Sequence, residues 1–128
     1  LATLPDEIKF AVAEFNRRVI TEAFTAAVAE ELARQIDPSL PGKTLIFAAS
    51  DARADMIVNA MKLAFQAAYG AIEDGAVRKI TGSVDRVGQL IRAYRNDALP
   101  TIAVTVDLLT TGIDVPKIEN LVFLRRVN

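Results

Sequence analysis

Cysteine and histidine are both missing from the 128 residues of this chain. Their absence excludes disulfide bonds, thiol nucleophiles, the usual zinc sites and acid–base catalysis by an imidazole. A magnesium site made only of carboxylates stays possible. The chain also lacks an excess of positive charge, because 15 basic residues face 16 acidic ones, for a net charge of −1. A domain that binds nucleic acid by itself normally has a basic excess, so if this chain touches nucleic acid, it does so as part of something larger.

Long apolar runs and targeting signals are missing as well. No hydrophobic stretch approaches the ~20 residues of a membrane span, and no signal peptide precedes the first expected helix. What is present is a globular composition, with 52% hydrophobic residues and scattered charge, in a length suited to one domain. The chain begins without Met and stops directly after an expected strand, so we expect an excised fragment.

The amino-terminal part of the chain follows a helical pattern. Apolar residues recur at helical spacing, but their stripe rotates to another face partway along. This change of face near residues 16–21 predicts two helices, or a helix and a linker, with Thr21 as an N-cap. Two prolines and a glycine in residues 37–42 then mark the boundary that composition supports. Composition therefore divides the chain into a helical segment, 1–40, and a strand–helix segment, 41–128. From the sequence alone, the helical segment could lead in from another domain or could equally be an amphipathic helix packed on the sheet of its own domain.

Expected strands and helices alternate through the rest of the chain. Short apolar runs rich in β-branched residues predict strands, and longer stretches with one apolar stripe predict helices, the second of them starting at Gly82 and Ser83. Such repeats imply βαβ units and a parallel sheet with right-handed crossovers. The predicted fold class is therefore α/β, with strands at 44–48, 77–81, 102–106 and 121–125 and helices at about 51–68 and 84–97.

Residues 41–44, Pro-Gly-Lys-Thr, look at first like part of a phosphate-binding P-loop. That motif needs a second glycine five residues before the one that precedes the lysine, and this position holds Asp37. A P-loop also opens a helix, whereas Lys43 and Thr44 lead into an expected strand. We interpret these residues as a turn before a strand.

The stretch from Thr101 to Arg126 is the most informative part of the sequence. An expected buried strand is followed by a short polar crossing, then by Pro116, which opposes continuation of a helix, and then by a second apolar strand. Polar residues therefore collect at the carboxyl end of the predicted sheet. Open α/β folds bind their ligands at this edge.

Within this stretch, Thr105, Asp107, Gly112 and Asp114 fit the pattern T-x-D-x-x-x-x-G-x-D. The pattern resembles motif V of superfamily-two helicases and translocases, which lies in their second RecA-like domain. In more detail, TVDLLTTGIDVP followed by a strand ending in Arg-Arg-Val resembles the motor (R) subunit of type I restriction enzymes. Twelve consecutive residues in register make this resemblance specific.

The resemblance implies roles for residues of the motif V stretch. Gly112 and Asp114 match positions that face the nucleotide, with Asp114 reaching toward the ribose across the cleft. Thr105 and Thr110 supply hydroxyls able to bind phosphate. Val106 stands where many relatives carry Thr, so the phosphate contact would pass to Thr105 or to the backbone.

Two other strand ends take part in the same resemblance. Residues 47–51 resemble motif IV, where a helix N-terminus contacts a DNA phosphate, although Ser50 is equally suited to capping that helix. Residues 80–83 repeat the arrangement one unit later, at a place where relatives touch the DNA backbone. The predicted DNA-backbone residues are therefore Ser50, Thr81, Gly82, Thr105 and Thr110, with no catalytic or metal-binding residue in this chain.

The family resemblance also implies a function for the whole. It implies a RecA-like helicase domain, truncated before motif VI, in the ATP-dependent DNA translocase of a type I restriction endonuclease, a cytoplasmic hydrolase. ATP and Mg²⁺ would be used by the parent protein and held by the first RecA-like domain of the same chain, and the isolated fragment would be inactive. Double-stranded DNA and the modification and specificity subunits are the other implied partners, with no membrane. The alternatives are a motor of another superfamily-two branch, or a non-catalytic α/β module that binds a nucleotide or metabolite.

Overall fold

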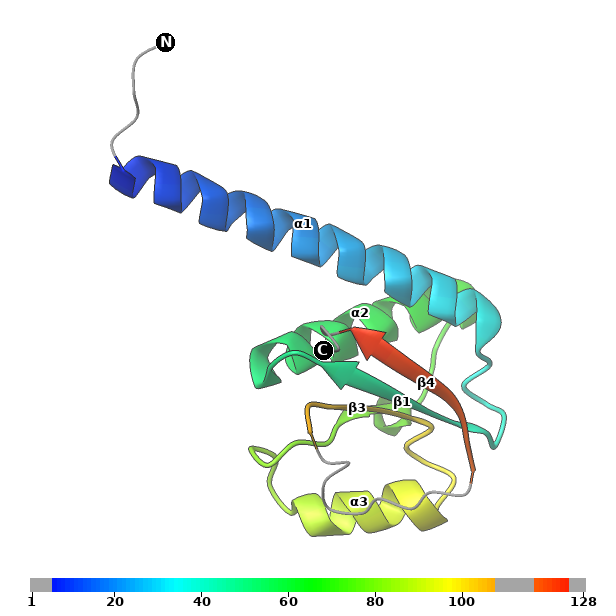
Figure 1. The fold of residues 1–128 in the computed structure, drawn as a ribbon. Helices are drawn as coiled ribbons and strands as arrows, with labels where there is room; N and C mark the ends of the chain where they lie inside the picture. The colour runs from blue at the N-terminus through cyan, green and yellow to red at the C-terminus, as the bar shows by residue number, and fades with distance from the viewer. Residues whose placement is uncertain (1–5, 108–116, 125–128) are drawn as a thin grey trace.

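Strands and helices alternate along the chain in the computed structural model, which describes residues 6–107 and 117–124, with side chains from residue 21 onward. Figure 1 shows helices on both sides of a sheet. The elements in chain order are α1 (Asp6–Gln35), β1 (Lys43–Ala48), α2 (Asp51–Tyr69), a 3₁₀ turn η1 (Asp74–Ala76), β2 (Val77–Lys79), α3 (Val87–Asn96), β3 (Ile102–Thr105) and β4 (Ile118–Leu124).

The sheet is parallel throughout its four described strands. Their order is β2-β3-β1-β4, and each neighbouring pair runs in the same direction. Thr44 pairs with Ile102 and Phe47 with Thr105, so the two central strands are in the predicted relation. The predicted α/β fold class, a parallel sheet of the RecA-like kind with flanking helices, is confirmed.

Some predicted boundaries differ from those in the structure. Strand β4 begins at Ile118 and not at Leu121, because backbone pairing with β1 extends it through the polar residues before the apolar run. Helix α3 begins at Val87, so the prediction that Gly82 and Ser83 start it is wrong. The chain instead makes a turn in which the Val84 N–H donates to the Thr81 carbonyl oxygen over 3.1 Å.

Helix α1 is continuous, and the predicted break near residues 16–21 is wrong. This segment contains no Gly or Pro, and a rotated apolar stripe alone does not interrupt backbone hydrogen bonding. Thr21 lies inside the helix, where its carbonyl oxygen accepts from the Thr25 hydroxyl at 2.8 Å. Among the described residues, no helix has both the length and the apolar character of a membrane span.

The larger of two hydrophobic clusters lies between the sheet and the helix pair α1–α2. Ala29 and Ala33 of α1 are buried against it, and their small side chains allow the two helices to approach closely. The Tyr69 hydroxyl of α2 donates to the carbonyl oxygens of Ala33 and Ile36, 3.1 and 3.0 Å away. These bonds satisfy carbonyl groups that the end of a helix leaves free, so the last turns of α1 are fixed to α2.

The other cluster lies between the sheet and α3. Tyr94 of α3 is buried, and its hydroxyl donates to the Thr44 carbonyl oxygen at 2.7 Å. Lys43, the first residue of β1, is also buried and donates to the carbonyl oxygens of Asp97 and Pro100 at 2.7 and 2.6 Å. Its ammonium lies 5.3 Å from the centre of the Tyr94 ring. The interpretation of residues 41–44 as a turn before a strand is confirmed. The side chain of Lys43 bonds backbone groups at the amino end of the sheet.

Candidate functional site at the carboxyl edge of the sheet

Three strand ends bring the predicted site residues to one edge of the sheet. Because the strands are parallel, the segments that follow β1, β2 and β3 leave the sheet on the same side. Ser50, Thr81 and Thr105 therefore belong to the same edge. The described residues do not include Thr110, Gly112 and Asp114, so the roles predicted for them stay predictions. Arg125 and Arg126 also lie outside the described residues.

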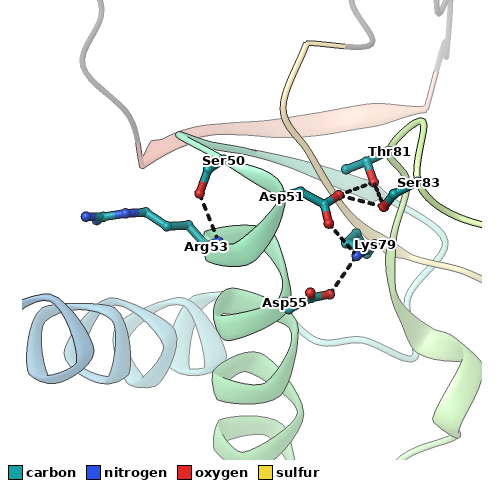
Figure 2. Close-up of polar contacts among 7 residues, drawn as sticks. All are labelled: Ser50, Asp51, Arg53, Asp55, Lys79, Thr81 and Ser83. Carbon is teal, nitrogen blue, oxygen red and sulfur yellow. Dashed lines mark hydrogen bonds and ion pairs between the residues drawn. The ribbon is translucent and has the colours of Figure 1, made fainter. Parts of the chain in front are cut away.

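Ser50 is the N-cap of α2. Its backbone is extended, and its Oγ accepts a hydrogen bond from the Arg53 N–H at 3.2 Å (Figure 2). The capping interpretation is confirmed. Since the oxygen acts here as an acceptor, the hydroxyl proton is not used by this bond, and the predicted contact to DNA stays a prediction.

Asp51 is the centre of a polar cluster that the sequence did not reveal. Its Oδ1 accepts from the Thr81 hydroxyl at 2.5 Å and from the Ser83 hydroxyl at 2.8 Å, while its Oδ2 lies 3.0 Å from the Lys79 ammonium (Figure 2). The same ammonium lies 2.8 Å from Asp55, one turn further along α2. These five side chains join the start of α2 to the segment between β2 and α3.

The cluster shifts the acidity of its charged members. The hydrogen bond from Thr81, with those from Lys79 and Ser83, lowers the pKa of Asp51 to about 2. The bonds from Lys79 to Asp55 and Asp51 raise the pKa of the lysine. Both groups are therefore held in their charged forms at neutral pH.

A regular spacing in the sequence carries the signal that was missed. Lys79 and Thr81 stand two positions apart where β2 ends, and extended backbone places such residues on one side, whereas Ser83 reaches the same carboxylate through the turn that follows. That side faces α2, where Asp51 and Asp55 stand one helical turn apart. The partners of Asp51 are 28 to 32 residues away from it in the sequence, so only the crossover between β1 and β2 brings them together.

The predicted DNA-contact residues Gly82 and Thr105 have opposite surroundings. Gly82 is exposed, and a Cβ atom built on it would meet nothing within 4 Å. Thr105 is 1% exposed, and among the residues that the structure describes its Oγ1 has no hydrogen-bond partner. The Thr105 hydroxyl therefore lies beneath the surface, while Gly82 presents bare backbone.

An open hollow of about 800 Å³ lies beside the strand ends and is lined by Phe24, Ala49, Arg53, Val106, Asp107, Phe123 and Leu124. Phe123 stacks on Phe47, with ring centres 5.0 Å apart. The Arg53 side chain extends away from the Asp51 cluster (Figure 2), and among the described residues its guanidinium has no ion-pair or hydrogen-bond partner. Arg53 is thus a second residue of this edge that the sequence did not reveal. In the described ranges, no group of three acidic side chains is placed to hold a metal ion.

Comparison with known proteins agrees with this architecture. The chain is 46% identical, over 98% of its length, to the type I restriction enzyme EcoKI endonuclease subunit of Escherichia coli (strain K12). A solved fragment assigned as the HsdR subunit of a type I restriction enzyme from Vibrio vulnificus YJ016 superposes with a TM-score of 0.67 at 25% identity, over 89% of this chain. No protein-family model matches.

The chain spans only a small part of both relatives, 11% of the Escherichia coli subunit and 23% of the Vibrio vulnificus chain. Within that part the relationship is clear, because nearly every residue of this chain is aligned. The predicted resemblance to the R subunit of type I restriction enzymes is confirmed. The chain aligns with a segment of such an endonuclease subunit.

Proposed function

We propose that this chain is part of the ATP-dependent DNA translocase of a type I restriction endonuclease, and that the carboxyl edge of its sheet contacts the DNA backbone and faces the ATP cleft. The observation that carries the proposal is the 46% identity to the EcoKI endonuclease subunit across 98% of the chain. The parallel sheet supports it, because ligands of such sheets bind at this edge.

Residues 41–128 would form part of the second RecA-like domain, and residues 1–40 would lead in from the first. Gly112 and Asp114 are the proposed nucleotide contacts from this chain. Lys43 is bonded to backbone carbonyl oxygens and is not placed as a phosphate-binding lysine. We therefore assign the main ATP and Mg²⁺ site to the first RecA-like domain of the same subunit. We also propose that the protein acts in the cytoplasm, in a complex with modification and specificity subunits.

The described edge offers donors suited to phosphate. The Arg53 guanidinium is exposed and free of an ion-pair partner within the described ranges, and the start of α2 beside it presents backbone N–H groups. Thr81 and Ser83, by contrast, already donate their hydroxyl protons to Asp51. Contacts to phosphate carry no sequence information, which suits a motor that must move over any sequence.

Movement would come from the cleft between the two RecA-like domains. Closing on ATP and reopening after hydrolysis would shift the phosphate contacts of this edge relative to those of the first domain. The bonds of Asp51 to Lys79 and Thr81 join the start of α2 to the end of β2 and the turn after it, which would let this part of the edge move as one body.

Arg53→Gln in the complete endonuclease subunit tests the DNA contact. If Arg53 contacts a phosphate, the variant should bind duplex DNA more weakly for all sequences, and the slope of log affinity against log salt should fall by about one. Arg92→Gln is the matched control, because Arg92 is an exposed arginine in the middle of α3. Equal slopes for wild type and Arg53→Gln would remove Arg53 from the DNA contact. A complete subunit that shows no DNA-stimulated ATP hydrolysis would overturn the proposed function.

A further inference from the structure

The two residues on either side of Gly82 are both bonded to one carboxylate. Thr81 and Ser83 donate to the same oxygen of Asp51, at 2.5 and 2.8 Å, and their own hydroxyl oxygens are 3.0 Å apart. The backbone closes the same turn, because the Val84 N–H donates to the Thr81 carbonyl oxygen. Gly82 is therefore held between two anchored neighbours, at the exposed point of the turn.

Gly82 itself is exposed at this turn. Apart from the glycine and its two chain neighbours, no atom lies within 4 Å of the position that a Cβ would occupy. Within the described part of the chain, the Gly82 N–H has no hydrogen-bond partner. An exposed, fixed and unused N–H group is a suitable donor for a phosphate oxygen.

We propose that Asp51 is a positioning residue for DNA binding, whose carboxylate holds the turn of Thr81 and Ser83 so that the Gly82 N–H can donate to a backbone phosphate. The proposal rests on the proposed function, in which this edge contacts DNA. It goes further in two ways. It assigns the contact to the protein backbone, and it assigns the positioning of that backbone to an acidic side chain that does not touch DNA.

The hydroxyl groups of the cluster are poor candidates for the contact itself. Each hydroxyl has one proton to give, and those of Thr81 and Ser83 are given to Asp51. Two carboxylates, Asp51 and Asp55, share the single ammonium of Lys79. A phosphate drawn into the cluster would meet this negative charge, whereas Gly82 lies at the exposed point of the turn.

A different role for Asp51 would give the opposite result. If its carboxylate only competed with phosphate for the donors of Lys79, Thr81 and Ser83, its removal would strengthen DNA binding and steepen the salt dependence. Loss of a positioned neutral N–H would weaken binding at every salt concentration without changing the slope, because no cation is removed.

The test uses Asp51→Asn in the complete endonuclease subunit, with duplex DNA affinity measured over a range of salt concentrations. We expect affinity to fall roughly tenfold, as for one lost bond to a charged acceptor, with an unchanged salt slope. Asp74→Asn is the matched control, since Asp74 pairs with Lys62 near the other end of α2 at 3.1 Å, and it should bind like wild type. Unchanged or stronger binding by Asp51→Asn would overturn the proposal.

A second pair of variants decides the question if Asp51→Asn does not fold. Thr81→Val keeps the shape of the side chain and removes one bond to Asp51, whereas Thr81→Ser keeps the hydroxyl. Weaker binding by the valine variant and restored binding by the serine variant support the positioning role, and equal binding by all three proteins overturns it. A wild-type subunit that fails to bind duplex DNA would instead overturn the proposed function, and the role of Asp51 with it.

Discussion

The two ends of the sheet each carry one dominant charge, and these charges are used differently. At the amino end, the Lys43 side chain is buried and its ammonium is bonded to backbone carbonyl oxygens of the chain. At the carboxyl end, the Asp51 side chain is 45% exposed and accepts from three side chains of one neighbouring segment. The buried Lys43 joins the start of β1 to the segment before β3. The partly exposed Asp51 instead bonds both hydroxyls of a surface turn.

The comparison suggests how architecture and function are divided in this domain. Desolvation makes an unpaired charge expensive at the amino end, and there the Lys43 ammonium is matched by carbonyl oxygens of the chain. Water reaches the carboxyl end, where Arg53 and the Gly82 backbone can stay free of protein partners among the described residues. Donors left free in this way are available to a ligand.

The largest expected effect is on stability, from Lys43→Met. Methionine fills much of the same volume but leaves the carbonyl oxygen of Pro100, in a buried place, and that of Asp97, in a part-buried one, without their donor. Each such loss destabilises by about 1–3 kcal/mol, so we expect a decrease of roughly 2–5 kcal/mol in the free energy of unfolding. Urea denaturation of the purified protein measures it.

Lys62→Met is the control for this variant. Lys62 is a lysine of α2 whose ion pair with Asp74 is largely solvent-exposed on the aspartate side, and exposed pairs contribute only about 0–1 kcal/mol. Similar midpoints for the two variants would show that the buried bonds of Lys43 stabilise the fold no more than the exposed ion pair of Lys62 does.

Sequence periodicity predicts most of the fold but little of the polar site. The four strands and both later helices follow from apolar runs and stripes, because burial of these residues is what forms the elements. The break predicted in α1 is wrong, since a rotated stripe reflects which neighbours the helix meets and not where its hydrogen bonds end. The local sequence pattern could not predict the Asp51 cluster, because only the crossover between β1 and β2 brings Lys79 and Thr81 to that carboxylate. Asp114 and Gly112 stay predictions from the motif.

A second prediction concerns acid stability. The pKa of Asp51 is lowered from its ordinary 3.8 to about 2, so the folded state binds this proton less tightly than the unfolded state. The stabilisation is fully present above pH 4 or so and is lost as pH falls through 3.8 toward 2. In Asp51→Asn the stability should therefore depend less steeply on pH in this range, as followed by thermal unfolding at each pH.

The control here is Asp74→Asn, which removes a carboxylate from the exposed pair with Lys62. Its pH dependence should match that of wild type. If the stability of Asp51→Asn and that of wild type fall equally as the pH is lowered, the bonds from Thr81 and Ser83 do not lower the pKa of Asp51 in solution.

The smallest expected effect on stability comes from Gly82→Ala, and it is informative because binding should respond more strongly than folding. Gly82 and Gly70 both have open space where a Cβ would stand. Gly70 has a φ of +83° at the C-cap of α2, so alanine there is strained by roughly 1–3 kcal/mol. Gly82 is not in that region, and alanine should change the free energy of unfolding by less than about 1 kcal/mol, toward greater stability through a less flexible unfolded chain.

DNA affinity should separate these two glycine variants in the opposite order. At Gly82 the new methyl group stands beside the N–H that we assign to a phosphate, so the Gly82→Ala subunit should fold normally and bind duplex DNA more weakly. Gly70 lies at the far end of α2 from Asp51, so Gly70→Ala should lose stability and keep its affinity for DNA while folded. Urea denaturation and DNA titration on the same preparations measure both quantities. A Gly82→Ala protein that binds DNA like wild type would show that the phosphate does not approach this backbone, and the difference between the two ends of the sheet would then be one of burial alone.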